Sequence, residues 1–72
     1  MNPYEELANA IIVQAVKDYR TALEALKINP KHKISIAEKK ECEDFFRSAW
    51  YRTLSSVDGE MLIAKLTEEA GL

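Results

Sequence analysis

Cysteine, histidine, glycine and proline are all scarce in this chain. Its 72 residues include one cysteine, one histidine, two glycines and two prolines. A lone cysteine cannot form an internal disulfide, and its presence favours a reducing, cytoplasmic setting. One cysteine and one histidine are also too few for a structural zinc site. We therefore expect neither a metal nor a cofactor.

A long apolar run and an excess of positive charge are also missing. The longest uncharged stretch, residues 7–16, is too short to span a bilayer, so we expect no membrane partner. The first residues carry two acids and no cation, so we expect no secretory signal peptide. Ten Lys and Arg residues against 12 Asp and Glu give a net charge of −2. The chain as a whole therefore lacks the basic footprint of a nucleic-acid-binding protein.

Capping signals and helical periodicity predict a long first helix. Asn2 is a favourable N-cap, Pro3 suits the first helical position, and Glu5 completes a variant of the capping box. Apolar residues then recur at spacings of three and four, as they do on one face of a helix. A proline at position 30 disfavours helix at the residue before it. We expect this helix to cover residues 3–27, and a short basic turn over residues 29–34 to follow it.

Two further capping signals predict two more helices. A capping box that begins at Ser35 precedes a helix expected over residues 36–54. A similar signal at Ser55 precedes a shorter helix expected over residues 57–69. Gly71 is placed to end this last helix as a C-terminal cap.

These three elements predict an all-α fold. Because the connections are short, the two long helices should return antiparallel as a hairpin, with the shorter third helix against them. We expect a three-helix bundle that forms a single domain over residues 1–72. The apolar arcs of the two long helices cover about 180°, which is more than one antiparallel neighbour needs. This surplus apolar surface favours a homodimer first, and a complex with another protein as the alternative.

The stretch ECEDFFRSAWYRTL, residues 41–54, is the richest source of apolar side chains. On a helical wheel both phenylalanines, Cys42 and Ala49 lie in the middle of the apolar arc, and we expect them in the core. The tryptophan lies at the edge of that arc and the tyrosine lies beyond it, and both residue types are favoured at interface hot spots. We therefore predict a partner interface formed by Trp50, Tyr51, Leu54, Met61 and Ile63.

A basic patch around the predicted turn supports a second interpretation. Cations cluster from Lys27 to Lys40 and could contact phosphate. In this alternative the protein is a DNA-associated accessory or regulatory factor. The predicted phosphate contacts are then Lys31, Lys33, Lys39 and Lys40. The same lysines also suit solubility and the charge at helix ends, and nucleic acid is the less favoured partner.

No combination of residues indicates catalysis. Cys42 is flanked by Glu41 and Glu43, which would raise the pKa of its thiol instead of activating it. His32 lies between two lysines in the turn, where the cations disfavour its protonated form. The acids of the second helix lack the Glu-x-x-His pairs of di-iron bundles. We therefore expect a protein that is not an enzyme.

Two segments carry a resemblance to known proteins. They are ANAIIVQAVKDYRTALEALKINP, residues 8–30, and ECEDFFRSAWYRTLSSVDGEMLI, residues 41–63. Over nearly the whole chain, from about Leu7 to Leu66, the sequence resembles a group of small helical proteins encoded on prophages and conjugative elements of Firmicutes. No activity is established for that group, so the resemblance implies a bacterial cytoplasm and a mobile element without implying site residues. It also implies that a host or element protein is a partner.

Overall fold

A computed structural model describes residues 2–72, and every element of secondary structure in that range is helical. The predicted all-α fold is therefore confirmed. The first helix, α1, covers Pro3–Ile28. The side chain of Asn2 caps it by accepting a hydrogen bond of 2.9 Å from the backbone N–H of Tyr4, as the sequence predicted.

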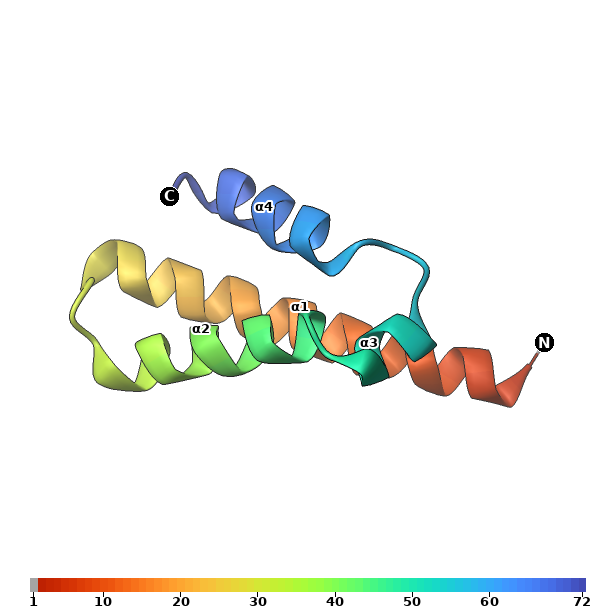
Figure 1. Ribbon diagram of the computed structural model, residues 1–72. Helices are drawn as coiled ribbons and strands as arrows, with labels where there is room; N and C mark the ends of the chain where they lie inside the picture. The colour runs from red at the N-terminus through yellow and green to blue at the C-terminus, as the bar shows by residue number, and fades with distance from the viewer. Residues whose placement is uncertain (1) are drawn as a thin grey trace.

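The second helix, α2, covers Lys33–Phe46 and begins three residues before the predicted start. Its N-cap is His32 and not Ser35. The Nδ1 atom of His32 accepts from the backbone N–H of Ser35 at 3.3 Å and lies 2.7 Å from its hydroxyl. Ser35 is buried within the first turn of α2, and its hydroxyl bonds to the capping side chain instead of forming the cap itself. Figure 1 shows α1 and α2 side by side and running in opposite directions.

The helix predicted over residues 36–54 is divided in the structure. After α2 ends at Phe46, a short helix, α3, covers Ala49–Leu54. Between them the backbone of Ser48 is extended. The hydroxyl of Ser48 donates to the carbonyl of Phe45 at 2.6 Å and accepts from the backbone N–H of Tyr51 at 3.1 Å. Because one side chain satisfies the end of α2 and the start of α3, the break is stabilised locally.

The last helix, α4, covers Gly59–Ala70 and begins two residues later than predicted. Asp58 caps it by accepting a hydrogen bond of 2.9 Å from the backbone N–H of Glu60. The side chain of Ser55 instead bonds within the preceding loop, where it accepts from the backbone N–H of Val57 at 3.0 Å. Gly71 ends α4 as predicted, with a φ of 80° that favours glycine.

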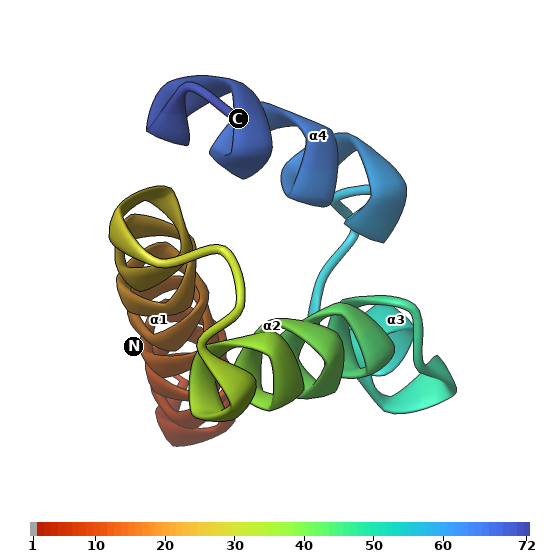
Figure 2. The same ribbon diagram turned by 90° about the vertical axis from the view of Figure 1, so that its left-hand side faces the viewer.

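The core lies where the four helices meet around aromatic rings. Tyr19, Phe46 and Tyr51 are fully buried, and Phe46 meets each of the other two rings edge-on with centroids 5.7 Å apart. Ile63 and Leu66 of α4 join this cluster. In Figure 2, α4 lies on one side of the layer that α1 and α2 form. Within residues 2–72 no helix covers the opposite side, which we call the open face.

Candidate protein-binding surface

An apolar groove lies between α1, the end of α2 and α3. Trp50 is 56% exposed, and its ring meets that of Phe45 edge-on, with centroids 5.4 Å apart and planes at 79°. Ile11 and Ala15 of α1 line the groove with these two rings, and its volume is about 420 Å³. An exposed tryptophan beside an apolar groove is typical of a protein-binding surface.

Exposed apolar side chains continue from this groove along α1. Tyr4 and Leu7 are both exposed. With Ile11 they occupy positions i, i+3 and i+7, so they lie on one face of the helix. The N-terminal end of α1 runs beyond α3 (Figure 1). The strip formed by Tyr4, Leu7 and Ile11, which we call the apolar strip, therefore extends the groove toward that end.

An acidic hollow adjoins the groove at its other end. Asp18 of α1 lines this hollow together with Glu38, Glu41 and Cys42 of α2, and its volume is about 340 Å³. Asp18 also lines the groove, so the two depressions lie next to each other. Among the described residues, no Lys or Arg nitrogen lies within ion-pair distance of these three carboxylates. The hollow therefore presents uncompensated negative charge.

The thiol of Cys42 reports the same negative environment. Burial and, to a smaller extent, the charges of Asp18, Glu38, Glu41 and Glu43 together raise the pKa of Cys42 to about 11. The thiol is therefore protonated at neutral pH and is a poor nucleophile. Its acidic neighbours act in the direction that the sequence predicted.

The structure places only part of the predicted interface at the surface. Trp50 is exposed, Met61 is 65% exposed and Leu54 is half-buried. In contrast, Tyr51 is 0% exposed and Ile63 is 8% exposed, so neither can contact a partner in this fold. The two residues belong to the core, and their assignment to an interface was wrong.

The break at Ser48 explains the error at Tyr51. A continuous helix would have placed this side chain beyond the apolar arc, whereas the turn before α3 directs it onto the ring of Phe46. The same turn leaves Ala49 exposed, although the wheel placed it in the core. Ile63 is buried because α4 presents that side to the aromatic cluster. Met61 lies on α4 and lines neither the groove nor the acidic hollow.

Sequence reasoning missed the α1 side of the groove and the acids beside it. The apolar periodicity did include Ile11 and Ala15. It could not show which part of the apolar arc α2 would leave open, because that depends on the rotation of two helices about their axes. Phe45 was predicted to be core and is half-buried, since one edge of its ring lines the groove.

Of the four lysines predicted to contact phosphate, two are exposed without an ion pair among the described residues and two form ion pairs with carboxylates. Lys31 and Lys33 are exposed in and after the turn. Lys39 forms an ion pair of 2.8 Å with Glu43, and Lys40 forms one of 2.9 Å with Asp44. Two of the four cations are therefore already compensated by carboxylates one helical turn away.

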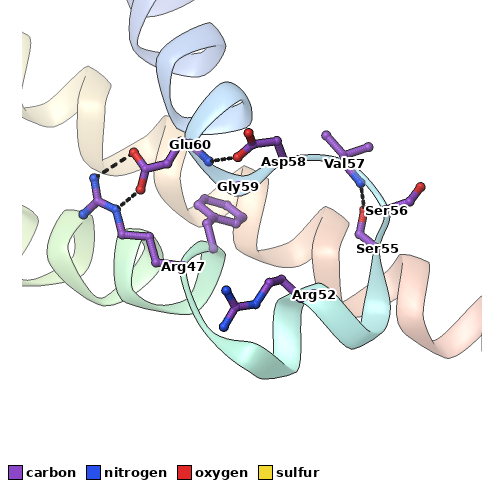
Figure 3. A pocket seen from close by; sticks show the side chains of 9 residues that line it. Arg47, Arg52, Ser55, Ser56, Val57, Asp58, Gly59 and Glu60 are labelled. Atoms are coloured by element: carbon purple, nitrogen blue, oxygen red, sulfur yellow. Dashed lines mark hydrogen bonds and ion pairs between the residues drawn. The ribbon is translucent and has the colours of Figure 1, made fainter.

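A second, more polar hollow lies between the end of α2, α3 and the start of α4 (Figure 3), and its volume is about 480 Å³. Arg47 forms an ion pair with Glu60 at its edge, and Arg52 also lines it. The carboxylate of Asp58 caps α4 at the same place. Glu60 pairs with Arg47 and the carboxylate of Asp58 caps α4, so of the two cations in this hollow only Arg52 has no ion pair among the described residues.

No protein-family model, curated protein or solved structure matches this chain. Within residues 2–72, no group of three or more His, Cys, Asp or Glu side chains is arranged to hold a metal ion. In the same range, no helix is both long enough and apolar enough to cross a bilayer. The groove and the acidic hollow are thus the surface features from which a function can be argued.

Proposed function

We propose that this protein is a non-enzymatic protein–protein interaction module whose binding surface is centred on Trp50. The observation that carries the proposal is the position of this side chain, which is 56% exposed beside an apolar groove. Full burial of a large apolar side chain stabilises a fold by roughly 1.5–3 kcal/mol. A small domain has few other sources of stability. The exposed part of the Trp50 ring therefore contributes little to the stability of the fold, and a partner that buries it gains binding free energy.

In this proposal the scaffold is a three-helix bundle of α1, α2 and α4, and α3 serves to present Trp50. The setting is that implied by the resemblance, the cytoplasm of a bacterium that carries a mobile element. The partner is then either a second copy of the chain or a protein of the host or the element. Both alternatives use the same exposed surface.

Nucleic-acid binding through the basic turn has less support. A phosphate contact by Lys39 or Lys40 would compete with the carboxylates that already pair with them. Only Lys31 and Lys33 of the predicted contacts are free of such ion pairs among the described residues. Two exposed lysines on a protein with a net charge of −2 provide a weak electrostatic footprint.

The proposal is tested by comparing Trp50→Ala with Met61→Ala. Both changes remove an exposed apolar side chain, but Met61 lies on α4 and away from the groove. We expect both variants to fold, as judged by circular dichroism. Only Trp50→Ala should lose association, measured by sedimentation of the pure protein across the micromolar range and by co-purification with host proteins. Equal association of the two variants, or none with the native protein, would contradict the proposal.

A further inference from the structure

We infer that the open face binds a cationic amphipathic helix of a partner protein. Its apolar side chains would occupy the groove beside Trp50, and its Lys or Arg side chains would meet the acidic hollow formed by Asp18, Glu38 and Glu41. This inference rests on the proposed function and specifies the chemistry of the partner.

The groove and the acidic hollow lie on the side of α1 that faces away from α4. Arg20 of α1 forms an ion pair of 3.0 Å with Glu69 of α4, so this side chain marks the α4 side. Asp18 precedes it by two residues, which is about 200° around a helix. No residue of α4 lines the groove or the acidic hollow. The antiparallel pair is therefore covered by α4 on one side, whereas on the open face only Trp50 of the short helix α3 borders the groove.

A helix is the element that fits this side. Helical bundles commonly pack a fourth helix against the free face of an antiparallel pair. The apolar strip and the groove extend along α1 from Tyr4 to Asp18, which is about 21 Å at 1.5 Å per residue. A partner helix of about 14 residues has the same length. Apolar anchors at i, i+3 and i+7 that enter a groove are a recurrent mode of recognition.

The charge of the open face specifies the polar side of that helix. The carboxylates of Asp18, Glu38 and Glu41 have no Lys or Arg partner in residues 2–72. The other two acids of α2, Glu43 and Asp44, each form an ion pair with a lysine. Neither the groove nor the acidic hollow is lined by a cation. Charge complementarity of this kind selects partners and speeds association.

A second copy of the chain fits the same surface less well. In a twofold dimer centred on the open face, the acids of one copy would lie against those of the other, which opposes association. If the twofold axis instead passed through the apolar strip, the two copies would overlap at their N-terminal ends, and the acidic hollow of each copy would stay without a partner.

The inference can be tested with three synthetic peptides and the fluorescence of Trp50, the only tryptophan in the chain. The peptides share one apolar helical face of Leu and Ile, contain no tryptophan, and carry Lys, Gln or Glu beside that face. We expect the Lys peptide to shift the emission to shorter wavelength as the indole is buried. The Gln peptide should bind roughly tenfold more weakly and the Glu peptide not at all. Added salt should weaken binding of the Lys peptide.

Charge-neutralising variants locate the contact. Asp18→Asn and Glu41→Gln change exposed side chains, and each should weaken binding of the Lys peptide by roughly two- to fivefold. Glu68→Gln is the matched control, because it makes the same change of charge at an exposed position of α4. The control should bind the Lys peptide with the affinity of the native protein.

The remaining outcomes each overturn the inference, and they separate it from the proposed function. Equal binding of the Lys, Gln and Glu peptides would keep Trp50 as a binding surface and refute the cationic partner. If no peptide binds but the protein associates with itself through Trp50, the occupant is a second copy. If no peptide binds and Trp50→Ala changes no association, both the inference and the proposed function fail.

Discussion

The hydroxyl of Tyr19 donates a hydrogen bond of 2.7 Å to Oε2 of Glu43, across the contact between α1 and α2. The same carboxylate oxygen accepts from Nζ of Lys39 at 2.8 Å, and the hydroxyl of Thr67 on α4 lies 3.5 Å from the Tyr19 oxygen. Tyr19 is fully buried. Side chains of α1, α2 and α4 therefore meet at the hydroxyl group of Tyr19, and these contacts set the register of the three helices.

Replacing Tyr19 by phenylalanine should destabilise the fold. The change keeps the ring that packs on Phe46 but removes the hydrogen bond to a charged acceptor. Such a bond contributes about 1.5–3 kcal/mol, so the free energy of unfolding should fall by that amount. Urea denaturation followed by circular dichroism measures it. Stability equal to that of the native protein would show that the hydroxyl contributes little to the packing of the three helices.

Glu43 should make the fold sensitive to acid. Burial alone would raise the pKa of Glu43, but hydrogen bonds from Lys39 and Tyr19 and the charges of Lys39 and Arg47 outweigh it and lower the pKa. A carboxyl group with a lowered pKa in the folded state stabilises the protein above its unfolded pKa of about 4.3. That contribution is lost as the pH falls through the folded pKa.

The variant Glu43→Gln isolates this contribution. It should be less stable than the native protein at pH 7 and should lose less stability between about pH 5 and the acid limit. Glu60→Gln serves as a control, because Glu60 is an exposed partner of Arg47 and shows no contact with Tyr19. If both variants kept the full acid dependence of the native protein, other carboxyl groups would be responsible for it.

Gly59 lies so close to α2 that even a methyl group should not fit. A Cβ atom at this position would be 2.9 Å from the carbonyl carbon of Phe46 and still closer to its oxygen. Backbone atoms cannot move aside as the end of a flexible side chain can. Gly59→Ala should therefore destabilise the protein by about 1–3 kcal/mol, although alanine favours helix formation by about 1 kcal/mol.

Gly71→Ala is the control for Gly59→Ala, because the two substitutions should destabilise the protein for different reasons. A Cβ at Gly71 has space, with Nζ of Lys27 at 3.8 Å, and its cost comes only from the positive φ of 80°. That conformational cost is roughly 1–2 kcal/mol. If Gly59→Ala is as stable as the native protein in thermal denaturation, the start of α4 must be able to move away from Phe46.

Local chemistry was enough to predict two of the helix ends, although the caps predicted at Ser35 and Ser55 are formed by His32 and Asp58 instead. Asn2 and Gly71 cap their helices as expected, because each cap bonds to backbone groups within a few positions. The break at Ser48 was not predicted, because no glycine or proline marks it and the apolar spacing continues through it. Besides the hydrogen bonds of Ser48, the packing of Tyr51 on Phe46 favours the break, and that contact exists only once α3 has turned.

The candidate surface was predictable to a smaller extent. The wheel placed Trp50 at the edge of the apolar arc, and it is exposed in the structure. The residues that complete the surface come from α1, and their exposure depends on how far α2 and α4 cover that helix. Asp18 is the clearest example, because it is one acid among many in the sequence and gains its position only from the packing of α1 with α2.

Tyr51→Phe should have the opposite effect to Tyr19→Phe. Tyr51 is 0% exposed, and its hydroxyl has no hydrogen-bond partner among residues 2–72. Burying an unpaired hydroxyl costs about 1–3 kcal/mol, so its removal should leave the free energy of unfolding unchanged or raise it by up to about 1 kcal/mol. The ring contacts with Phe45 and Phe46 do not involve the hydroxyl and should persist. Urea denaturation of both variants under the same conditions makes the comparison, and a destabilised Tyr51→Phe would show that this hydroxyl is paired in solution.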